Sequence, residues 1–397
     1  MTAYLNALGL TCALGRGQAE VAARLFAGDC SGMQAQPGWI PERCPTVGAV
    51  QGELPAVPLP TQHSRNNQLL YSAAMQIEPA IRQAIARFGA QRIAVVLGTS
   101  TSGIAEGSAA IAQQRQSGQF PPDYRYDQQA LSAPAEFLAD WLQLSGPAYV
   151  ISTACTSSGR ALLSARRLLD LGVCDAVLCG GVDSLCGLTL NGFNALEAIS
   201  QARCNPFSQN RDGINIGEAA ALFLMTAERN TDGPSLALLG AGASSDAYHI
   251  SAPDPSGAGA RQTMALALNN AGLEPEQIDY LNLHGTATEH NDAMESLAVH
   301  GLFGAQLACS STKPMTGHTL GAAGALEAAL CWLSLSEHNP HGQLPPHVWD
   351  GQADPRLPAL NLVDGTQRMH AARPRRIMSN SFAFGGNNVS LIVGDTP

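Results

Sequence analysis

Residues 149–159 read YVISTACTSSG, an apolar run followed by small and hydroxyl-bearing residues. The apolar run predicts a buried strand, and the residues from Arg160 to Leu171 show the spacing of a helix. The turn between them places Cys155 at the N-terminus of the predicted helix, where unpaired N–H groups and the helix dipole favour a thiolate. By itself, this cysteine fits a nucleophile and a buried structural thiol equally well.

The second half of the chain repeats this arrangement. Residues 278–283 predict a strand that ends in His284. Residues 308–312 predict another strand, which leads through His318 into a helix over residues 322–335. His318 therefore occupies a position equivalent to that of Cys155.

Such a long-period repeat predicts a duplicated α/β protein. We expect an N-terminal half over residues 1–235, which carries Cys155, and a C-terminal half over residues 236–397, which carries the other candidate residues. Buried apolar strands that alternate with helices predict stacked α/β layers.

Composition excludes several classes of protein. The chain has 397 residues, of which 45% are hydrophobic and 14% are charged, which is unlike a disordered chain. The net charge of −10 argues against binding to nucleic acid or to an anionic membrane. No stretch approaches the roughly 18 apolar residues of a membrane span, and the N-terminus lacks the basic region of a secretory signal. Sparse charge favours a large subunit interface.

The ten cysteines are scattered and form no CxxC pair, so we expect neither a disulfide framework nor a metal site. Cysteines that form no disulfides are typical of a reducing compartment, so we expect the protein in the cytoplasm.

One lysine stands out among the basic residues. Of the 22 lysines and arginines, only Lys313 is a lysine, and it lies five residues before His318. The helix after His318 carries Glu327, which we expect to be a buried ion-pair partner of this lysine. Near the C-terminus, residues 379–388 carry two phenylalanines among small residues, which fits either an ordinary turn before the last strand or a lid over a pocket.

Taken together, these segments resemble the elongating β-ketoacyl-[acyl carrier protein] synthases, the type II ketosynthases of the thiolase-like superfamily. The matching motifs occur in the family's order: TACTSSG at 153–159, HGTAT at 284–288, STKPMTGH at 311–318 and SNSFAFGG at 379–386. The resemblance covers essentially the whole chain and implies a five-layered αβαβα fold.

The resemblance also implies a role for each residue of the motifs. Cys155 would accept the acyl chain, while His284 and His318 would promote decarboxylation of malonyl-carrier protein and stabilise the enolate. Lys313 would orient this cluster. The N–H groups of Cys155 and Phe384 would form the oxyanion hole, and Phe384 would also gate the acyl pocket.

Further positions match supporting roles in the family. Asp292 and Asp246 match acidic positions of the site framework and of a mobile loop. Thr286 and Thr288 resemble contacts to the phosphopantetheine arm. That arm arrives on the acyl carrier protein, so no dissociable cofactor is expected. Arg65 and Arg203 are candidates for docking the carrier protein.

The expected assembly is a homodimer or a heterodimer with a ketosynthase-like chain-length factor. Ala383 and Asn387 depart from the family's usual glycine and threonine, and residues 205–207 lack a common basic residue. These departures favour a specialised enzyme that elongates a fatty-acid, polyene or polyketide-like chain.

Two alternative functions are less well supported. A thiolase would place a second cysteine where this chain has Phe384-Gly385-Gly386. A non-catalytic chain-length-determining subunit would lack the nucleophile, whereas Cys155 is intact.

Overall fold

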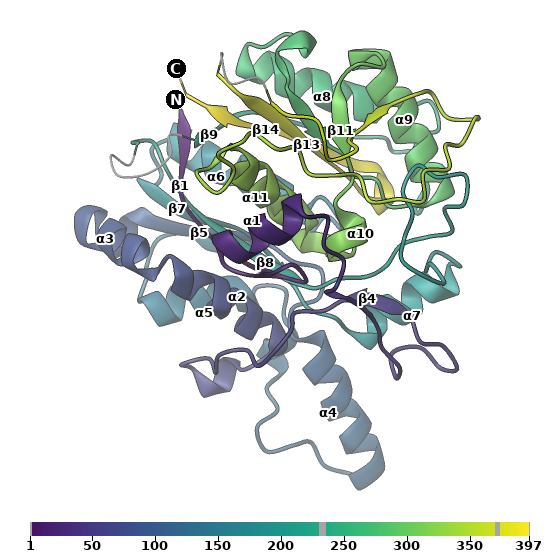
Figure 1. Ribbon diagram of the computed structural model, residues 1–397. Helices are drawn as coiled ribbons and strands as arrows, with labels where there is room; N and C mark the ends of the chain where they lie inside the picture. The colour runs from purple at the N-terminus through teal and green to yellow at the C-terminus, as the bar shows by residue number, and fades with distance from the viewer. Residues whose placement is uncertain (1, 230–235, 370–373, 397) are drawn as a thin grey trace.

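Two sets of five strands follow the same order in the computed structural model, which describes residues 2–229, 236–369 and 374–396 (Figure 1). The first set runs in the order β6-β5-β7-β8-β1 and the second in the order β11-β10-β13-β14-β9. Numbered along the chain, both orders are 3-2-4-5-1, and in each half two parallel pairings precede two antiparallel ones. The predicted duplication is therefore confirmed.

The strands of the first set are β1 (Ala3–Cys12), β5 (Ile93–Gly98), β6 (Ala148–Ile151), β7 (Ala176–Asp183) and β8 (Ala219–Thr226). Those of the second set are β9 (Leu236–Ser245), β10 (Tyr280–Asn282), β11 (Ala308–Ser310), β13 (Arg376–Phe382) and β14 (Asn387–Asp395). The predicted boundary between the halves adjoins residues 230–235, which lie outside the described residues.

The two half-sheets are connected at one place. β1 and β9 pair antiparallel through Ala3 with Leu238 and Tyr4 with Ala237, so the strand order is continuous across both halves. The minor strands are β12 (Asn361–Leu362) beside β11, β2 (Gly15–Arg16) beside β1, and the separate pair β3 (Met33–Ala35) and β4 (Thr46–Gly48).

Helices complete five layers, as predicted (Figure 1). The central layer holds α1 (Gln18–Phe26), α6 (Ser157–Asp170) and α11 (Ala323–Leu335). One outer layer holds α2 (Arg65–Gln76), α3 (Glu78–Phe88) and α5 (Ala133–Leu142), and the other holds α8 (Ala258–Ala271) and α9 (Glu289–Phe303). Every residue of α11 is buried, because sheets cover the central layer from both sides.

Glycines let α6 press closely against its neighbours. A Cβ atom on Gly181 would lie 2.5 Å from the Cβ atom of Ser158, and one on Gly324 would lie 2.8 Å from the backbone nitrogen of Gly159. β7 continues through Gly180 and Gly181 to Asp183, and the missing side chain of Gly181 allows α6 to pack against this strand.

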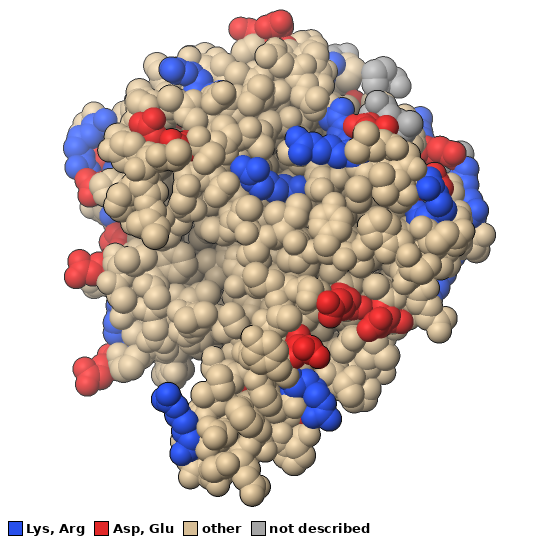
Figure 2. Space-filling model, turned by 180° about the vertical axis from the view of Figure 1, so that it is seen from behind, with Lys and Arg blue, Asp and Glu red and all other residues tan. Residues whose placement is uncertain are grey.

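α4 (Ile104–Ser117) projects away from the layers (Figure 1). Exposed apolar side chains gather on it and on the segment after it, namely those of Ile111, Phe120, Tyr126 and Leu131. β6 lies at the end of the strand order, and three of its four residues are half-buried. Viewed from behind, broad areas of the surface carry no charged side chain (Figure 2). A group of exposed apolar side chains such as the one on α4 and the segment after it is typical of a subunit interface.

The remaining helices are α7 (Gly187–Ala195) and the short α10 (Lys313–Thr316). Within the described residues, no helix combines the length and the apolar character that crossing a membrane requires.

Candidate active site

Cys155 lies in a sharp turn between β6 and α6. Ala154 has a φ of 53°, in the left-handed region, and α6 begins two residues after the cysteine. The Ser157 hydroxyl braces the turn, because it accepts a hydrogen bond from the Thr153 N–H at 2.9 Å and donates one to the Ala154 carbonyl at 2.5 Å. The turn leaves Cys155 7% exposed at the base of a cavity.

His318 brings the C-terminal half into contact with this cysteine. Its Nε2 atom lies 2.9 Å from Cys155 Sγ. The His318 N–H donates to the Asn215 carbonyl at 2.7 Å, and the His318 carbonyl accepts from Gly217 N–H at 2.9 Å. Residues of the N-terminal half thus hold this histidine at the nucleophile.

His284 follows β10 and completes the cluster. Its ring centroid lies 5.3 Å from that of His318, with the two rings nearly perpendicular. The carboxylate of Glu295 on α9 accepts hydrogen bonds from the N–H groups of His284 at 2.8 Å and Gly285 at 2.7 Å. We did not predict Glu295. Glu295 lies three residues after Asp292, so both carboxylates fall on the same face of one helix. That spacing was the feature of the sequence that could have pointed to Glu295.

Lys313 lies behind His284. Its ammonium group donates to the His284 carbonyl and to Glu327 Oε1, and its Nζ atom is 3.4 Å from His284 Nδ1. The expected pairing of Lys313 with Glu327 is confirmed, and both side chains are buried. Because an ammonium group only donates, His284 Nδ1 must accept, so the hydrogen of the neutral ring is assigned to Nε2.

Burial controls the protonation of the cluster. It raises the pKa of the Cys155 thiol to about 12, although the charge of Lys313 acts in the opposite direction. The expected preference for a thiolate is therefore not met in the protein without substrate, because the desolvation of the buried thiolate outweighs the charge of Lys313. Burial and Lys313 also bring the pKa values of His284 and His318 well below their usual range. At neutral pH the site holds a thiol and two neutral imidazoles.

Two family models match most of this chain. Residues 80–231 match the N-terminal domain of beta-ketoacyl synthase, and residues 236–348 match its C-terminal domain. The chain belongs to the β-ketoacyl synthase family. It is 31% identical over 346 residues to 3-oxoacyl-[acyl-carrier-protein] synthase 2 from Synechocystis sp., an alignment that covers 82% of this chain and 81% of that protein.

A second relative aligns over a shorter stretch. Nodulation protein E from Rhizobium meliloti is 35% identical over 259 residues, which cover 63% of this chain and 62% of the length of that relative.

Solved structures of the family superpose over the whole chain. A chain from the complex of a ketosynthase (ApeO) with its chain length factor (ApeC) from Xenorhabdus doucetiae is 47% identical, with a TM-score of 0.93 and coverage of 100% of this chain and 98% of that one. A beta-ketoacyl synthase from Burkholderia phymatum is 27% identical, with a TM-score of 0.87 and full coverage of both chains.

The cavity that reaches the Cys155, His284 and His318 cluster has a volume of about 340 Å³. Thr286 and Thr288 line it, and their hydroxyl oxygens are 3.0 Å apart. β10 ends at Asn282, before the two threonines, and Ala287 between them has a φ of 63°.

Phe384 lines the same cavity, and its ring contacts a residue of α7. Its ring centroid is 5.4 Å from that of Phe193, which the sequence analysis did not single out. Ala383 has φ −125° and ψ 155°, an extended conformation that any residue adopts, so its Cβ atom causes no backbone strain in this state of the loop. The turn itself depends on Gly385 and Gly386, which have φ values of 81° and 77°.

The two predicted supporting aspartates contact backbone segments near the cavity. Asp246 Oδ1 accepts from the Asn388 side chain at 2.6 Å, and the Asp246 N–H donates to the Gly386 carbonyl at 2.8 Å. Asp292 accepts from the Phe207 N–H at 2.8 Å, and burial raises its pKa to about 6. Asp246 thus holds the loop of residues 383–388 in place through hydrogen bonds, while Asp292 holds residues 205–207 in place.

The two predicted docking arginines differ in their surroundings. Arg65 forms a bidentate pair with the buried carboxylate of Glu218, at 2.7 and 2.5 Å. The Arg65 side chain remains 37% exposed while it is paired, so its docking role stays a prediction. Arg203 is exposed and lies close to Cys30.

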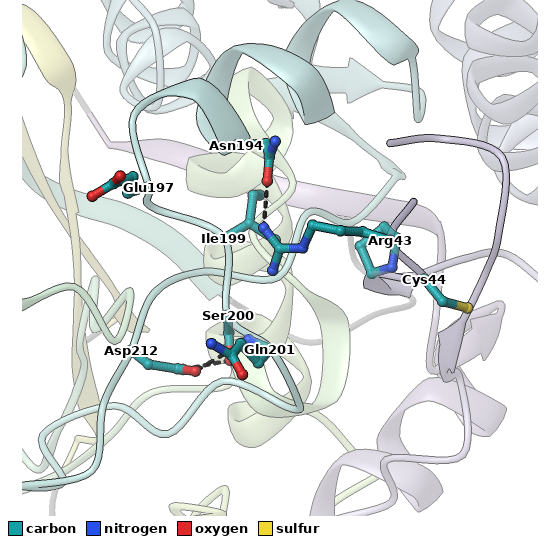
Figure 3. A pocket seen from close by; sticks show the side chains of 9 residues that line it. Arg43, Cys44, Asn194, Glu197, Ile199, Ser200, Gln201 and Asp212 are labelled. Carbon is teal, nitrogen blue, oxygen red and sulfur yellow. Dashed lines mark hydrogen bonds between the residues drawn. The ribbon is translucent and has the colours of Figure 1, made fainter. Parts of the chain in front are cut away.

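A second cavity, of about 450 Å³, adjoins the segment after α7 (Figure 3). Arg43 donates to Asn194 there, and Asp212 accepts from the Ser200 hydroxyl at 2.5 Å and the Gln201 N–H at 3.1 Å. Cys155, Lys313 and both histidines are absent from its described lining, so we place the chemistry in the smaller cavity.

Proposed function

We propose that this chain catalyses decarboxylative Claisen condensation of an acyl thioester with malonyl-[acyl carrier protein], which elongates the acyl chain by two carbons. The observation that carries the proposal is the contact of 2.9 Å between Cys155 Sγ and His318 Nε2, in a cavity that also exposes His284. A thiol next to a neutral imidazole suits acyl transfer, and a second imidazole suits stabilisation of an enolate.

In the first step, Cys155 accepts the acyl group. His318 Nε2 takes the thiol proton as the sulfur attacks the thioester carbonyl. The bond between the carbonyl carbon and the carrier sulfur then breaks, and the carrier thiolate receives that proton. The high thiol pKa makes this acceptor necessary, since few Cys155 thiolates exist at neutral pH without it.

In the second step, malonyl-carrier protein loses carbon dioxide and becomes an enolate. The Nε2–H group of His284 donates a hydrogen bond to the enolate oxygen. The enolate carbon attacks the Cys155 thioester, whose carbonyl oxygen binds to the N–H groups of Cys155 and Phe384. Cys155 leaves as a thiolate and regains a proton from solvent. Lys313 fixes the His284 ring through Nδ1 and the carbonyl group.

The substrates arrive on a phosphopantetheine arm, so the reaction uses no dissociable cofactor. Thr286 and Thr288 are suited to hold this arm, because both hydroxyls line the cavity. All ten cysteines have free thiols, which supports a reducing compartment, the cytoplasm.

We further propose that a chain length factor is the partner subunit. The similar chain from Xenorhabdus doucetiae belongs to a complex of a ketosynthase with its chain length factor. The exposed edge of β6 and the apolar side chains of Ile111, Phe120, Tyr126 and Leu131 offer the interface. Such pairing favours a specialised polyene or polyketide-like product. Co-expression with a chain length factor followed by light scattering tests this: a stable heterodimer supports it, and a homodimer that excludes the factor overturns it.

Intact-mass spectrometry after incubation with a panel of acyl-carrier proteins tests the reaction itself. We expect a gain of one acyl group on the native protein and none on Cys155→Ala. Labelling that persists in the alanine variant, or no labelling even with the partner subunit present, would overturn the proposal.

A further inference from the structure

His347 is a buried histidine that the two steps of the proposed reaction do not use. It is 5% exposed. Its Nδ1 atom lies 3.1 Å from the backbone nitrogen of Ser311, and its Nε2 atom lies 3.0 Å from the Pro206 carbonyl oxygen. Because a backbone N–H group only donates and a carbonyl group only accepts, the ring hydrogen is assigned to Nε2. Burial lowers the pKa of His347 to about 4, which agrees with a neutral ring.

One arm of this bridge leads to Lys313. Ser311, whose N–H group donates to His347, lies directly after β11 and two residues before Lys313. The Ser311 hydroxyl accepts from the Lys313 N–H group at 3.3 Å and donates to the Gly285 carbonyl at 2.7 Å. Gly285 follows His284, whose carbonyl accepts from the Lys313 ammonium group. The acceptor atom of His347 thus holds the residue that joins Lys313 to this backbone.

The second arm reaches the same backbone through Phe207. Phe207 follows Pro206, the acceptor of the Nε2–H group, and the rings of Phe207 and His347 have centroids 6.0 Å apart. A Cβ atom on Gly285 would lie 2.9 Å from Phe207 Cε2, so the phenylalanine ring packs directly against this glycine. Pro206 belongs to the N-terminal half of the chain and Ser311 to the C-terminal half. His347 therefore joins the two halves through residues that contact Gly285.

The nucleophile is held by other residues. The Ser157 hydroxyl braces the turn of Cys155, and the His318 N–H group donates to the Asn215 carbonyl. Transfer of the acyl group to the thiol uses the thiol and this imidazole. A change at His347 should therefore leave that step intact.

We propose that His347 is a positioning residue for the second step, decarboxylation and condensation, because its ring joins Ser311 to Pro206. That bridge fixes the backbone of His284 and the contact of His284 with Lys313. The inference rests on the proposed function. Stabilisation of the enolate depends on where the His284 ring lies, since a hydrogen bond weakens steeply when its donor is misplaced.

Two amide variants separate the arms of the bridge. His347→Asn places an amide oxygen near the position of Nδ1 and can still accept from Ser311, whereas His347→Gln places an amide nitrogen near that of Nε2 and can still donate to Pro206. The matched control is His338→Gln. His338 lies just beyond the C-terminal end of α11, and its Nε2 atom is 3.2 Å from Gln18 Oε1.

Two rates are measured for each variant: acyl transfer to Cys155 by intact-mass spectrometry, and release of carbon dioxide from malonyl-carrier protein. We expect His347→Gln to slow the release about tenfold or more while acyl transfer changes less than about twofold, because the arm through Ser311 leads to Lys313. His347→Asn should retain most of the release, and the control should match the native protein. A purely structural role would lower both rates together.

The NMR resonances of the His284 ring nitrogens give a readout that needs no substrate. They should shift in His347→Gln, because the contact of His284 with Lys313 changes, and stay unchanged in the control. An equal loss of both rates in His347→Gln, an equal slowing of release in His347→Asn, or unchanged release with unchanged resonances would overturn the positioning role. A native protein that neither accepts an acyl group nor releases carbon dioxide would overturn the proposed function, and the resonances would then decide the positioning role alone.

Discussion

The Sγ atom of Cys155 lies 2.9 Å from the Nε2 atom of His318, although the two residues belong to opposite halves of the chain. The helices that follow them, α6 and α11, meet where a Cβ atom on Gly324 would lie 2.8 Å from the Gly159 nitrogen. Because this approach admits no larger side chain, the two glycines let the central helices that follow Cys155 and His318 pack closely against each other.

The raised thiol pKa predicts a particular pH profile for alkylation of Cys155. A thiol with a pKa of about 12 stays protonated through the neutral range, and only the thiolate reacts. The rate of reaction with iodoacetamide should therefore rise about tenfold per pH unit between about pH 7 and pH 9. Mass spectrometry of the labelled peptide measures this rate. A rate that levels off below about pH 8 would contradict the high pKa.

The Lys313–Glu327 pair predicts a separation of stability from activity. Lys313→Met leaves the Glu327 carboxylate buried without its partner, which should lower the free energy of unfolding by about 3–5 kcal/mol. The double variant Lys313→Met, Glu327→Gln removes both charges and should recover most of that loss. Condensation should fall at least about a hundredfold in both variants, because His284 loses its anchor.

Urea denaturation and a condensation assay measure the two effects separately. A Lys313→Met variant that keeps its stability would show that the pair is not buried as described. A double variant that regains activity would assign Lys313 a role in stability alone.

The gate turn predicts a ranking of three substitutions. A Cβ atom on Gly386 would lie 2.9 Å from the Asp246 Cβ atom at a φ of 77°, so Gly386→Ala should distort the loop and lower condensation about tenfold or more. Gly385→Ala has free space and only the cost of its φ of 81°, about 1–2 kcal/mol. Ala383→Gly should change the rate least, since Ala383 is extended. The ranking fails if Ala383→Gly is the most damaging of the three in steady-state kinetics.

The thiol and imidazole cluster also predicts the effect of metals. The Cys155, His284 and His318 ligand atoms lie within 4.8 Å of one another, a spacing that a metal ion could use. The Lys313 ammonium, 3.4 Å from His284 Nδ1, disfavours a cation there. EDTA should therefore leave condensation unchanged in the purified protein. A loss with EDTA that zinc restores would reveal a catalytic metal.

Much of the site was predictable because its residues occur in local motifs. The motifs around Cys155, His284 and Lys313 each follow a short strand. The strands before His284 and Lys313, β10 and β11, are parallel neighbours, so their carboxyl ends lie together. The bounds of the elements were less predictable. α6 begins at Ser157 and not at Arg160, since the small residues after Cys155 already form its first turn.

Other features depend on contacts between distant segments. Glu295 supports His284 across 11 residues, and Phe193 meets Phe384 from the other half of the chain. The engagement of Arg65 by Glu218 joins residues 153 apart, and no local pattern indicates it.

The sequence by itself determined the duplicated α/β architecture, the candidate nucleophile and the pairing of Lys313 with Glu327, because hydrophobic periodicity and short motifs are local properties. Only the tertiary structure decided the protonation of Cys155 and which residues line its cavity. Both depend on what surrounds a group in three dimensions: the sheets and helices packed around the thiol raise its pKa, and the fold brings lining residues of both halves of the chain together.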